Sequence, residues 1–310
     1  MTLRATVLIP TFDHGPTLLR SVPSALRQTV EDVEVFVVGD GAPDVTREVM
    51  AELVRSDERV RFFDNPKGPR HGEVLRHAAL QEARGRVICY LSDDDLWAPD
   101  HVETLSACLE QADLAHSLVA AVLPDQTWLL GRVDLSLEWY RQQLLAGIGH
   151  LPLSTVGHTL EAYRKLPHGW RTTPPGIGTD VYMWRQFLAD PACRASAAYR
   201  LTVFNFASAE RPDWSIEERV EELDRWIAAM AKPGWQERAL ADLLRETSRD
   251  RLAVWTLYED ARGFLQKSRE EFETITGTRT WRLRQRLLSS PTVGAFLRSA
   301  GRARRRPAGR

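Results

Sequence analysis

The sequence contains little cysteine and no long apolar run. Its three cysteines, Cys89, Cys108 and Cys193, lack the spacing of a metal site. Such a sparse and odd number excludes a disulfide framework and is typical of a reducing cytoplasm. No stretch approaches the roughly 20 apolar residues that a membrane span needs, and Met1 to Ala5 do not form a signal-peptide pattern. We therefore expect a cytoplasmic protein, either soluble or bound peripherally at the inner face of the membrane.

The chain also lacks a strong net charge. Its formal net charge at pH 7 is -1, so the molecule as a whole has no general attraction for polyanions, and we expect no nucleic-acid partner. The C-terminus is different, because ten arginines and no acidic residue follow from Arg279 onward, counting Arg279 itself. Such an end can bind anionic lipid. RNA binding and a solvated tail without a partner are the alternatives.

The first third of the chain alternates short apolar runs with stretches of helical periodicity. Strands that alternate with helices of about 10 to 15 residues are typical of βαβ units, so the pattern predicts an α/β fold with a mainly parallel sheet. The strands are predicted at residues 5–9, 33–38, 60–63 and 87–91, and the helices at 17–28, 45–55 and 73–83.

Polar residues follow three of the predicted strands. Thr11 and Asp13 follow the first strand, Asp40 follows the second, and the run Asp93–Asp95 follows the fourth. In sheets of this kind ligands bind beyond the carboxyl ends of the strands. We therefore expect these side chains to converge on one rim of the sheet and to form a binding site.

The run Asp93–Asp95 is the most informative motif of the chain. Three adjacent carboxylates repel one another, so folding alone gives no reason to place them at the end of a buried strand. Asp93 and Asp95 are two residues apart and share a face in an extended segment, from which they can reach Mg²⁺ or Mn²⁺. The alternative is an acidic turn that caps the following helix.

The rest of the chain divides into an irregular part and a helical part. Residues 112–210 contain short apolar runs and a loop rich in proline and glycine, whereas residues 216–266 have helical spacing. We predict one domain at 1–210, with a nucleotide-binding half at 1–115 and an acceptor half at 116–210. A helical C-terminal region at 211–300 and a basic, disordered tail at 301–310 complete the organisation.

Three motifs, in this order and spacing, carry a resemblance to a known family. They are Val7-Leu8-Ile9-Pro10-Thr11-Phe12, Val37-Val38-Gly39-Asp40-Gly41 and Leu91-Ser92-Asp93-Asp94-Asp95. Together they resemble the family-2 glycosyltransferases of the bacterial type, over roughly residues 2–209. The resemblance implies a GT-A fold, with a nucleotide-binding α/β half and an acceptor-binding half. It also implies a nucleotide-diphosphate sugar as donor and a divalent cation, Mn²⁺ or Mg²⁺, as cofactor.

The resemblance assigns roles at the donor site. Pro10 and Thr11 match the residues that begin the nucleotide pocket, and Asp40 matches the aspartate that contacts the base and ribose. Asp93 and Asp95 match the Asp-x-Asp element, in which one carboxylate faces the ribose and the other holds the metal. We assign Asp95 to the metal, and Asp93 with Asp94 to the donor.

The resemblance also implies a catalytic base. Thr179-Asp180 stands where the family has Glu-Asp before a helix, so Asp180 is the expected base and transfer is expected to invert the anomeric carbon. The alternative is that Asp180 only interacts favourably with the dipole of that helix. The acceptor is expected to be a hydroxyl on a glycan, a lipid carrier or a metabolite.

Departures from the family keep other interpretations open. Gly39 replaces an aspartate of the family, and Thr179 replaces its glutamate. A catalytically degenerate scaffold protein is therefore the second hypothesis, and a nucleotidyltransferase is a third. The Gln-x-x-Arg-Trp motif of processive synthases is absent from the chain.

Weaker candidates are also present. His158 is a candidate for a metal or diphosphate contact, with a capping role as its alternative, and Trp170 and Trp184 are candidates for sugar stacking or for simple packing. The basic segment Lys67–Gly72 can touch phosphate or form a solvated turn.

Overall fold

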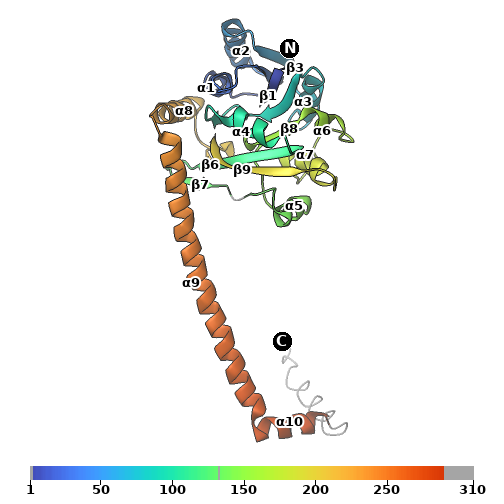
Figure 1. Cartoon of the computed structure of the whole chain (residues 1–310), viewed down its shortest axis with the longest axis vertical. Helices are drawn as coiled ribbons and strands as arrows, with labels where there is room; N and C mark the ends of the chain where they lie inside the picture. Colours follow the sequence, from blue (N-terminus) through green and yellow to red (C-terminus); the bar gives the residue numbers. More distant parts are fainter. Residues whose placement is uncertain (1–2, 132, 290–310) are drawn as a thin grey trace, which may run out of the picture. The chain divides into compact units, whose positions relative to one another are not determined.

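The computed structural model describes residues 3–131 and 133–289, and its elements follow the predicted alternation of strands and helices (Figure 1). The strands are β1 (Leu3–Thr11), β2 (Val33–Asp40), β3 (Val60–Asn65), β4 (Gly85–Tyr90), β5 (Leu96–Trp97), β6 (Leu114–Val122), β7 (Trp128–Leu130), β8 (Val156–Thr159) and β9 (Ala195–Asn205). The helices are α1 (Gly15–Leu26), α2 (Asp44–Ser56), α3 (Glu73–Leu80), α4 (His101–Cys108), α5 (Glu138–Leu145), α6 (Leu160–Arg164), α7 (Thr179–Leu188), α8 (Ile216–Met230), α9 (Trp235–Gly277) and α10 (Arg279–Ser289), with short 3-10 turns η1 (Leu153–Thr155) and η2 (Ser208–Glu210).

The strands form one nine-stranded sheet in the order β3-β2-β1-β4-β8-β6-β9-β5, and β7 pairs with β6. The four strands of the first third, β1 to β4, are parallel. Beyond β4 the sheet is mixed, since β8 runs antiparallel to both β4 and β6 whereas β9 runs parallel to β6. The α/β prediction is confirmed, and the parallel part corresponds to the half in which nucleotide binding was predicted.

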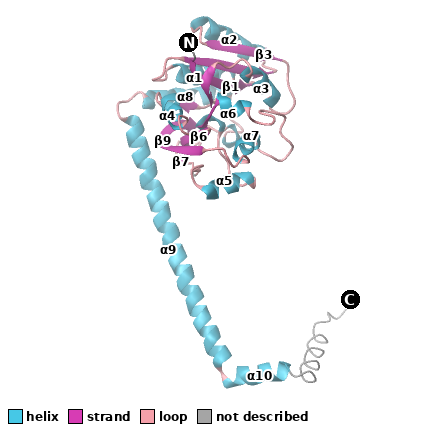
Figure 2. Cartoon of the chain, turned by 45° about the vertical axis from the view of Figure 1, so that its right-hand side comes forward, coloured by secondary structure: helices cyan, strands magenta, loops and turns pink. Residues whose placement is uncertain are grey.

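Helices cover both faces of this sheet (Figure 2). Successive side chains of a strand point to opposite faces, so Val7 and Ile9 pack under α1 and α2 while Leu8 packs on the other face with α3 and α7. The near-continuous apolar run of β1 is explained by this arrangement, because a strand buried on both faces needs apolar residues at every position.

A third apolar cluster joins α8 to the sheet. Leu223 and Trp226 of α8 pack against Phe204 and Phe206 at the end of β9. The buried Arg211, which precedes α8, makes two hydrogen bonds of 2.7 and 2.8 Å to the carboxylate of Glu222 on that helix. Helix α8 is thus part of the same core as the sheet, and it supplies a side chain to the site described below.

The chain divides into two compact units, the first ending at Arg245 and the second beginning at Glu246. The boundary predicted at residue 210 lies before α8, whereas α8 packs within the first unit because its apolar face completes the core around β9. The second unit contains the rest of α9 together with α10. Among the described residues, no helix is long and apolar enough to cross a membrane. The predicted tail at 301–310 lies outside the described residues.

Candidate active site

A cleft of about 380 Å³ lies at the carboxyl ends of β1, β2 and β4. It is the site that the rule for parallel sheets predicts, because polar loops follow each of these strands. The cleft is lined by Pro10, Thr11, Phe12, Asp13, His14, Val38, Asp40, Lys67, His71, Gly72, Arg76, Ser92, Asp93, Asp94, Leu153, Thr179, Asp180 and Ser208. Of the residues assigned to the donor, the metal or the base, only Asp95 is missing from this set.

Asp40 is held at the floor of the cleft by the loop before α3. Its Oδ1 accepts a 2.6 Å hydrogen bond from the backbone N–H of Gly68, and its Oδ2 pairs with the ammonium of Lys67. Gly72 has a φ of +67°, and a Cβ at this position would lie 2.6 Å from Cγ of Asp40. The glycine therefore permits a close approach that another residue would block. In this structure the ammonium of Lys67, in the basic segment Lys67–Gly72, is therefore paired with the carboxylate of Asp40.

The end of β1 positions the first acidic residue. The hydroxyl of Thr11 donates a 2.7 Å hydrogen bond to Oδ2 of Asp93, and the hydroxyl of Thr17 on α1 lies 2.7 Å from the Asp93 carbonyl oxygen. One strand, β1, and one helix, α1, therefore set the orientation of Asp93. Pro10 lines the cleft beside them.

His14, Asp93 and Asp94 form a compact group of ligand atoms. One such atom from each residue lies within 4.8 Å of the other two, and Nδ1 of His14 lies 3.2 Å from Oδ1 of Asp93. The hydrogen bond to Asp93 raises the pKa of His14 to about 9 against the opposing effect of burial, and the charges of Asp93 and Asp94 add to it. Without a metal, the imidazolium partly neutralises these acids.

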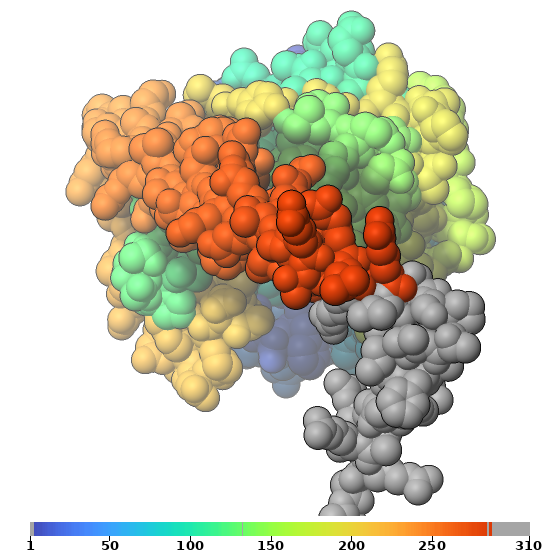
Figure 3. Space-filling model, turned by 90° about the horizontal axis from the view of Figure 1, so that it is seen from below, coloured from blue at the N-terminus to red at the C-terminus, as the bar shows by residue number. Residues whose placement is uncertain are grey.

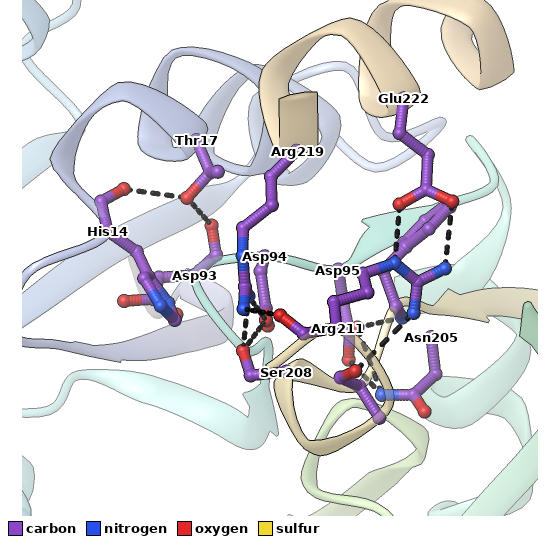
Figure 4. A network of polar contacts seen from close by, with 12 residues as sticks. His14, Thr17, Asp93, Asp94, Asp95, Asn205, Ser208, Arg211, Arg219 and Glu222 are labelled. Atoms are coloured by element: carbon purple, nitrogen blue, oxygen red, sulfur yellow. Dashed lines mark hydrogen bonds and ion pairs between the residues drawn. The ribbon is translucent and has the colours of Figure 1, made fainter. Parts of the chain in front are cut away.

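A second cation reaches the same group from α8 (Figure 4). The hydroxyl of Ser208 donates to Oδ2 of Asp94 at 2.7 Å, and Arg219 donates to that hydroxyl at 2.6 Å. The Arg219 guanidinium is 3.7 Å from the Asp94 carboxylate. Burial and the neighbouring Asp93 charge raise the pKa of Asp94 despite these contacts. In the absence of a metal, two carboxylates thus face two cations, the imidazolium of His14 and the guanidinium of Arg219.

Asp95 does not lie in the cleft. Its side chain is fully buried, and both carboxylate oxygens accept hydrogen bonds, from Ser154 Oγ, Asn205 Nδ2 and the backbone N–H of Phe206. Burial raises its pKa to about 7. The assignment of Asp95 to the metal needs correction, because the chain turns at Asp93 and Asp94 and the extended spacing that would put Asp93 and Asp95 on one face does not hold.

Asp180 lies across the cleft at the start of α7. Its Oδ2 accepts a 3.1 Å hydrogen bond from the backbone N–H of Leu153. Burial is the largest influence on its carboxyl group and raises the pKa, although the nearby Arg76 acts in the opposite direction. A carboxylate with a raised pKa at the wall of a cleft is suited to accept a proton.

Arg76 of α3 also lines the cleft, and sequence reasoning did not single it out. It is 7% exposed, and its guanidinium stacks 4.8 Å from the ring of Trp170. Its Nη2 donates to the carbonyl of His71, whereas its Nε and Nη1 have no hydrogen-bond partner among the described residues. A buried cation with unused donors is costly unless an anion completes its contacts, so Arg76 is suited to bind an anionic group in the cleft.

The weaker histidine and tryptophan candidates belong to the core beside the cleft. Nε2 of His158 lies 2.7 Å from the hydroxyl of Tyr90, and its Nδ1 lies 3.0 Å from the carbonyl of Thr159. Trp170 donates a 2.9 Å hydrogen bond to the same Tyr90 hydroxyl, and Trp184 is fully buried. These polar atoms have partners inside the core, as expected if Trp170 and Trp184 only pack there, and His158 lies in β8 and outside the lining of the cleft.

His14, Ser208 and Arg219 are the other site residues that sequence reasoning missed. His14 had a usable signal, since it follows β1 at the same strand end as Thr11. Ser208 and Arg219 had none, because they follow Asp94 by more than 100 residues and reach it only through the packing of α8.

Comparison with known proteins agrees with this geometry. The model of the family described as Glycosyl transferase family 2 matches residues 6–165. The succinoglycan biosynthesis protein ExoO of Rhizobium meliloti is 33% identical over 150 residues, which cover 48% of this chain and 40% of that protein. The chondroitin synthase of Pasteurella multocida is 37% identical over 105 residues, covering 34% of this chain and 10% of that protein. The chain thus spans less than half of these relatives.

Solved structures share the fold at low identity. The crystal structure of S. aureus TarS 1-349 has a TM-score of 0.52 and 15% identity, and the match covers 78% of this chain and 71% of that one. A structure of the same protein in complex with UDP-GlcNAc matches with the same TM-score and covers 72% of that chain. This likeness shows the fold, which is GT-A.

Proposed function

Because the chain belongs to glycosyl transferase family 2, we propose that it transfers a sugar from a nucleotide-diphosphate sugar to an acceptor hydroxyl, with a divalent cation and with inversion at the anomeric carbon. The observation that carries the proposal is the composition of the cleft, in which Asp40, the pair Asp93 and Asp94, and Asp180 line one cavity. The donor, the metal and the acceptor can therefore bind in the same cavity.

The nucleoside end of the donor is assigned to the β1 and β2 side of the cleft. Asp40 is held rigidly by Gly68 and Lys67, and Pro10 and Thr11 form the adjoining wall. Such a wall can position a base and ribose before chemistry begins. Arg76 lies further along the same cavity, where its unused donors suit the diphosphate or the sugar.

The metal assignment moves from Asp95 to Asp94. The donor set of His14, Asp93 and Asp94 fits Mn²⁺ or Mg²⁺, because its ligand atoms are mutually close and two of them are carboxylates. When bound, a divalent cation supplies positive charge to the leaving diphosphate. His14 must lose its proton to bind the cation, so binding is expected to release a proton. Asp93 keeps its orientation through Thr11.

Asp180 is proposed as the general base. The acceptor oxygen attacks the anomeric carbon and its proton passes to Asp180, while the bond from that carbon to the diphosphate oxygen breaks and the nucleotide diphosphate leaves. A base on the side opposite the leaving group gives inversion in one displacement. Burial raises the pKa of Asp180, and a more basic carboxylate accepts a proton more readily.

The acceptor is proposed to be a hydroxyl on a glycan, a lipid carrier or a metabolite. A lipid-linked acceptor suits peripheral contact with an anionic membrane through the arginines from Arg279 onward, of which those beyond residue 289 lie outside the described residues. Loss of anionic liposome binding after removal of this arginine-rich end would support the contact, and failure of the intact chain to bind at low salt would exclude it.

A panel of nucleotide diphosphates, tested by thermal shift with and without Mn²⁺, examines the proposal. We expect one nucleotide to stabilise the protein only with the metal, and Asp94→Asn to remove this effect. Asp44→Asn, a change at the exposed start of α2, is the matched control. No stabilisation by any nucleotide would favour the degenerate scaffold. Transfer of a nucleotidyl group, detected as release of diphosphate from a nucleoside triphosphate, would favour the nucleotidyltransferase.

A further inference from the structure

Helix α9 carries an apolar stripe within the second unit. Val254, Tyr258, Ala261, Leu265, Phe272 and Ile275 are separated by four, three, four, seven and three residues. This is the a/d spacing of a heptad repeat, and only Ser268 interrupts it. The repeat extends over three heptads and about 32 Å of helix at 1.5 Å per residue.

The large side chains of the stripe are exposed. Val254 is 64% exposed, Leu265 68%, Phe272 60% and Ile275 55%. Leu257 and Phe264, at 69% and 70%, widen the stripe on one flank. Figure 3 draws the side chains of α9 and α10 in orange to red. A helix in water with this much contiguous apolar surface needs another surface to cover it.

Charge favours a protein partner over a lipid surface. Residues 246–277 contain seven acidic and five basic residues, a net charge of -2. Helices that lie on anionic membranes have a polar face rich in lysine and arginine, whereas here the face opposite the stripe carries the acidic residues Glu259, Glu270 and Glu273. The arginines that attract lipid are concentrated in the segment that follows α9.

A second copy of α9 has the residues needed to cover the stripe. If two copies of α9 lie parallel and in register, each stripe residue contacts the same residue of the other copy. A residue on the flank of the stripe then lies next to the residue five positions later in the other copy. Those flanking pairs are Leu257 with Arg262 and Phe264 with Arg269, so no like charges meet. The long arginine side chains can also cover the apolar flank with their methylene groups.

We propose that α9 forms a coiled coil with a second copy of this chain through the stripe from Val254 to Ile275. The association joins catalytic units through a segment outside the cleft, so it is independent of the donor chemistry. It would hold at least two active sites on one assembly, which increases the effective concentration of a polymeric acceptor at the second site.

Light scattering coupled to size-exclusion chromatography of the full chain tests the proposal. We expect a mass of at least twice the 35.2 kDa of the chain, and a shift to the single-chain mass in Leu265→Asp. The adjacent change Gln266→Asp is the matched control, because it lies outside the stripe and should leave the assembly intact. Far-ultraviolet circular dichroism and donor binding of the Leu265→Asp protein check that the first unit stays folded.

Two outcomes would overturn the proposal. One is that the full chain has the mass of a single copy at micromolar concentration, whether or not it also binds anionic vesicles through α9. The other is an assembly that persists unchanged in the double variant Leu265→Asp, Phe272→Asp, because such an assembly uses another surface.

Discussion

The carboxylates of Asp94 and Asp95 are adjacent in the chain, but only that of Asp94 lines the cleft. Asp94 faces Ser208 and Arg219 at the cleft wall, whereas Asp95 is enclosed between Ser154 and Asn205. The turn at the end of β4 separates them, so one residue is available for chemistry and the other connects the turn to β9.

Asp94→Asn is expected to lower the transfer rate by about 100-fold or more, because the cation that neutralises the leaving diphosphate would lose a carboxylate ligand. The pKa of Asp94 is raised by burial and by Asp93, so removing its charge should not lower the free energy of unfolding. Transfer assays over a range of Mn²⁺ concentrations and urea titrations measure the two effects. A fully active Asp94→Asn enzyme would show that the metal assignment is wrong.

Asp95→Ala is expected to act on stability. The change leaves buried donors of Ser154, Asn205 and Phe206 without an acceptor, at a cost of about 1–3 kcal/mol in the free energy of unfolding. Urea titration measures this loss. If Asp95→Ala instead unfolded normally but failed to respond to Mn²⁺, the original assignment of Asp95 to the metal would be restored.

Asp180→Asn is expected to reduce transfer by about 100-fold or more while the affinity for the nucleotide diphosphate stays within about threefold, because the base acts on the acceptor. The carboxamide can still accept the hydrogen bond from the Leu153 N–H. Single-turnover transfer and nucleotide titration separate the two quantities. Turnover at the wild-type rate would leave Asp180 with only its helix-terminal role.

Arg219→Gln is expected to destabilise the metal-free protein by about 1–3 kcal/mol, since the change removes a partly buried cation beside Asp94. The same change should increase the thermal shift caused by Mn²⁺, because the metal no longer competes with the guanidinium. Thermal unfolding with EDTA measures the predicted loss of stability, and thermal unfolding with Mn²⁺ measures the predicted increase in the thermal shift. An unchanged metal response would mean that Arg219 has no part in the charge balance of the cluster.

His158 is expected to make the protein sensitive to acid. Burial lowers its pKa to about 4 from an ordinary value of 6.5, so its contribution is fully present above pH 6.5 and is lost as the pH falls toward 4. The shift corresponds to about 3 kcal/mol. Urea unfolding at pH 7 and pH 4.5 should show a smaller difference in His158→Gln than in the wild type. Equal differences in the two proteins would contradict the expectation.

Much of the fold was predictable because its signals are local. The apolar runs of β1 to β4 and the helical periodicity between them depend on residues close in sequence, and the structure places these elements within a few residues of the predicted positions. The family resemblance also rested on short strand-end motifs. The domain boundary was less predictable, since the apolar face of α8 does not reveal that Leu223 and Trp226 complete the core at Phe204.

The sequence by itself determined the α/β class, the family and the strand ends at which Thr11, Asp40 and the acidic run would meet, because periodicity and parallel order place such residues on one rim. Only the tertiary structure decided which acids of the run line the cleft, namely Asp93 and Asp94 and not Asp95. That choice depends on the turn after β4 and on partners contributed by β9, η2 and α8, more than 100 residues away. Contacts of that range leave no local pattern, which is why Arg219 and the buried role of Asp95 were visible only in the folded chain.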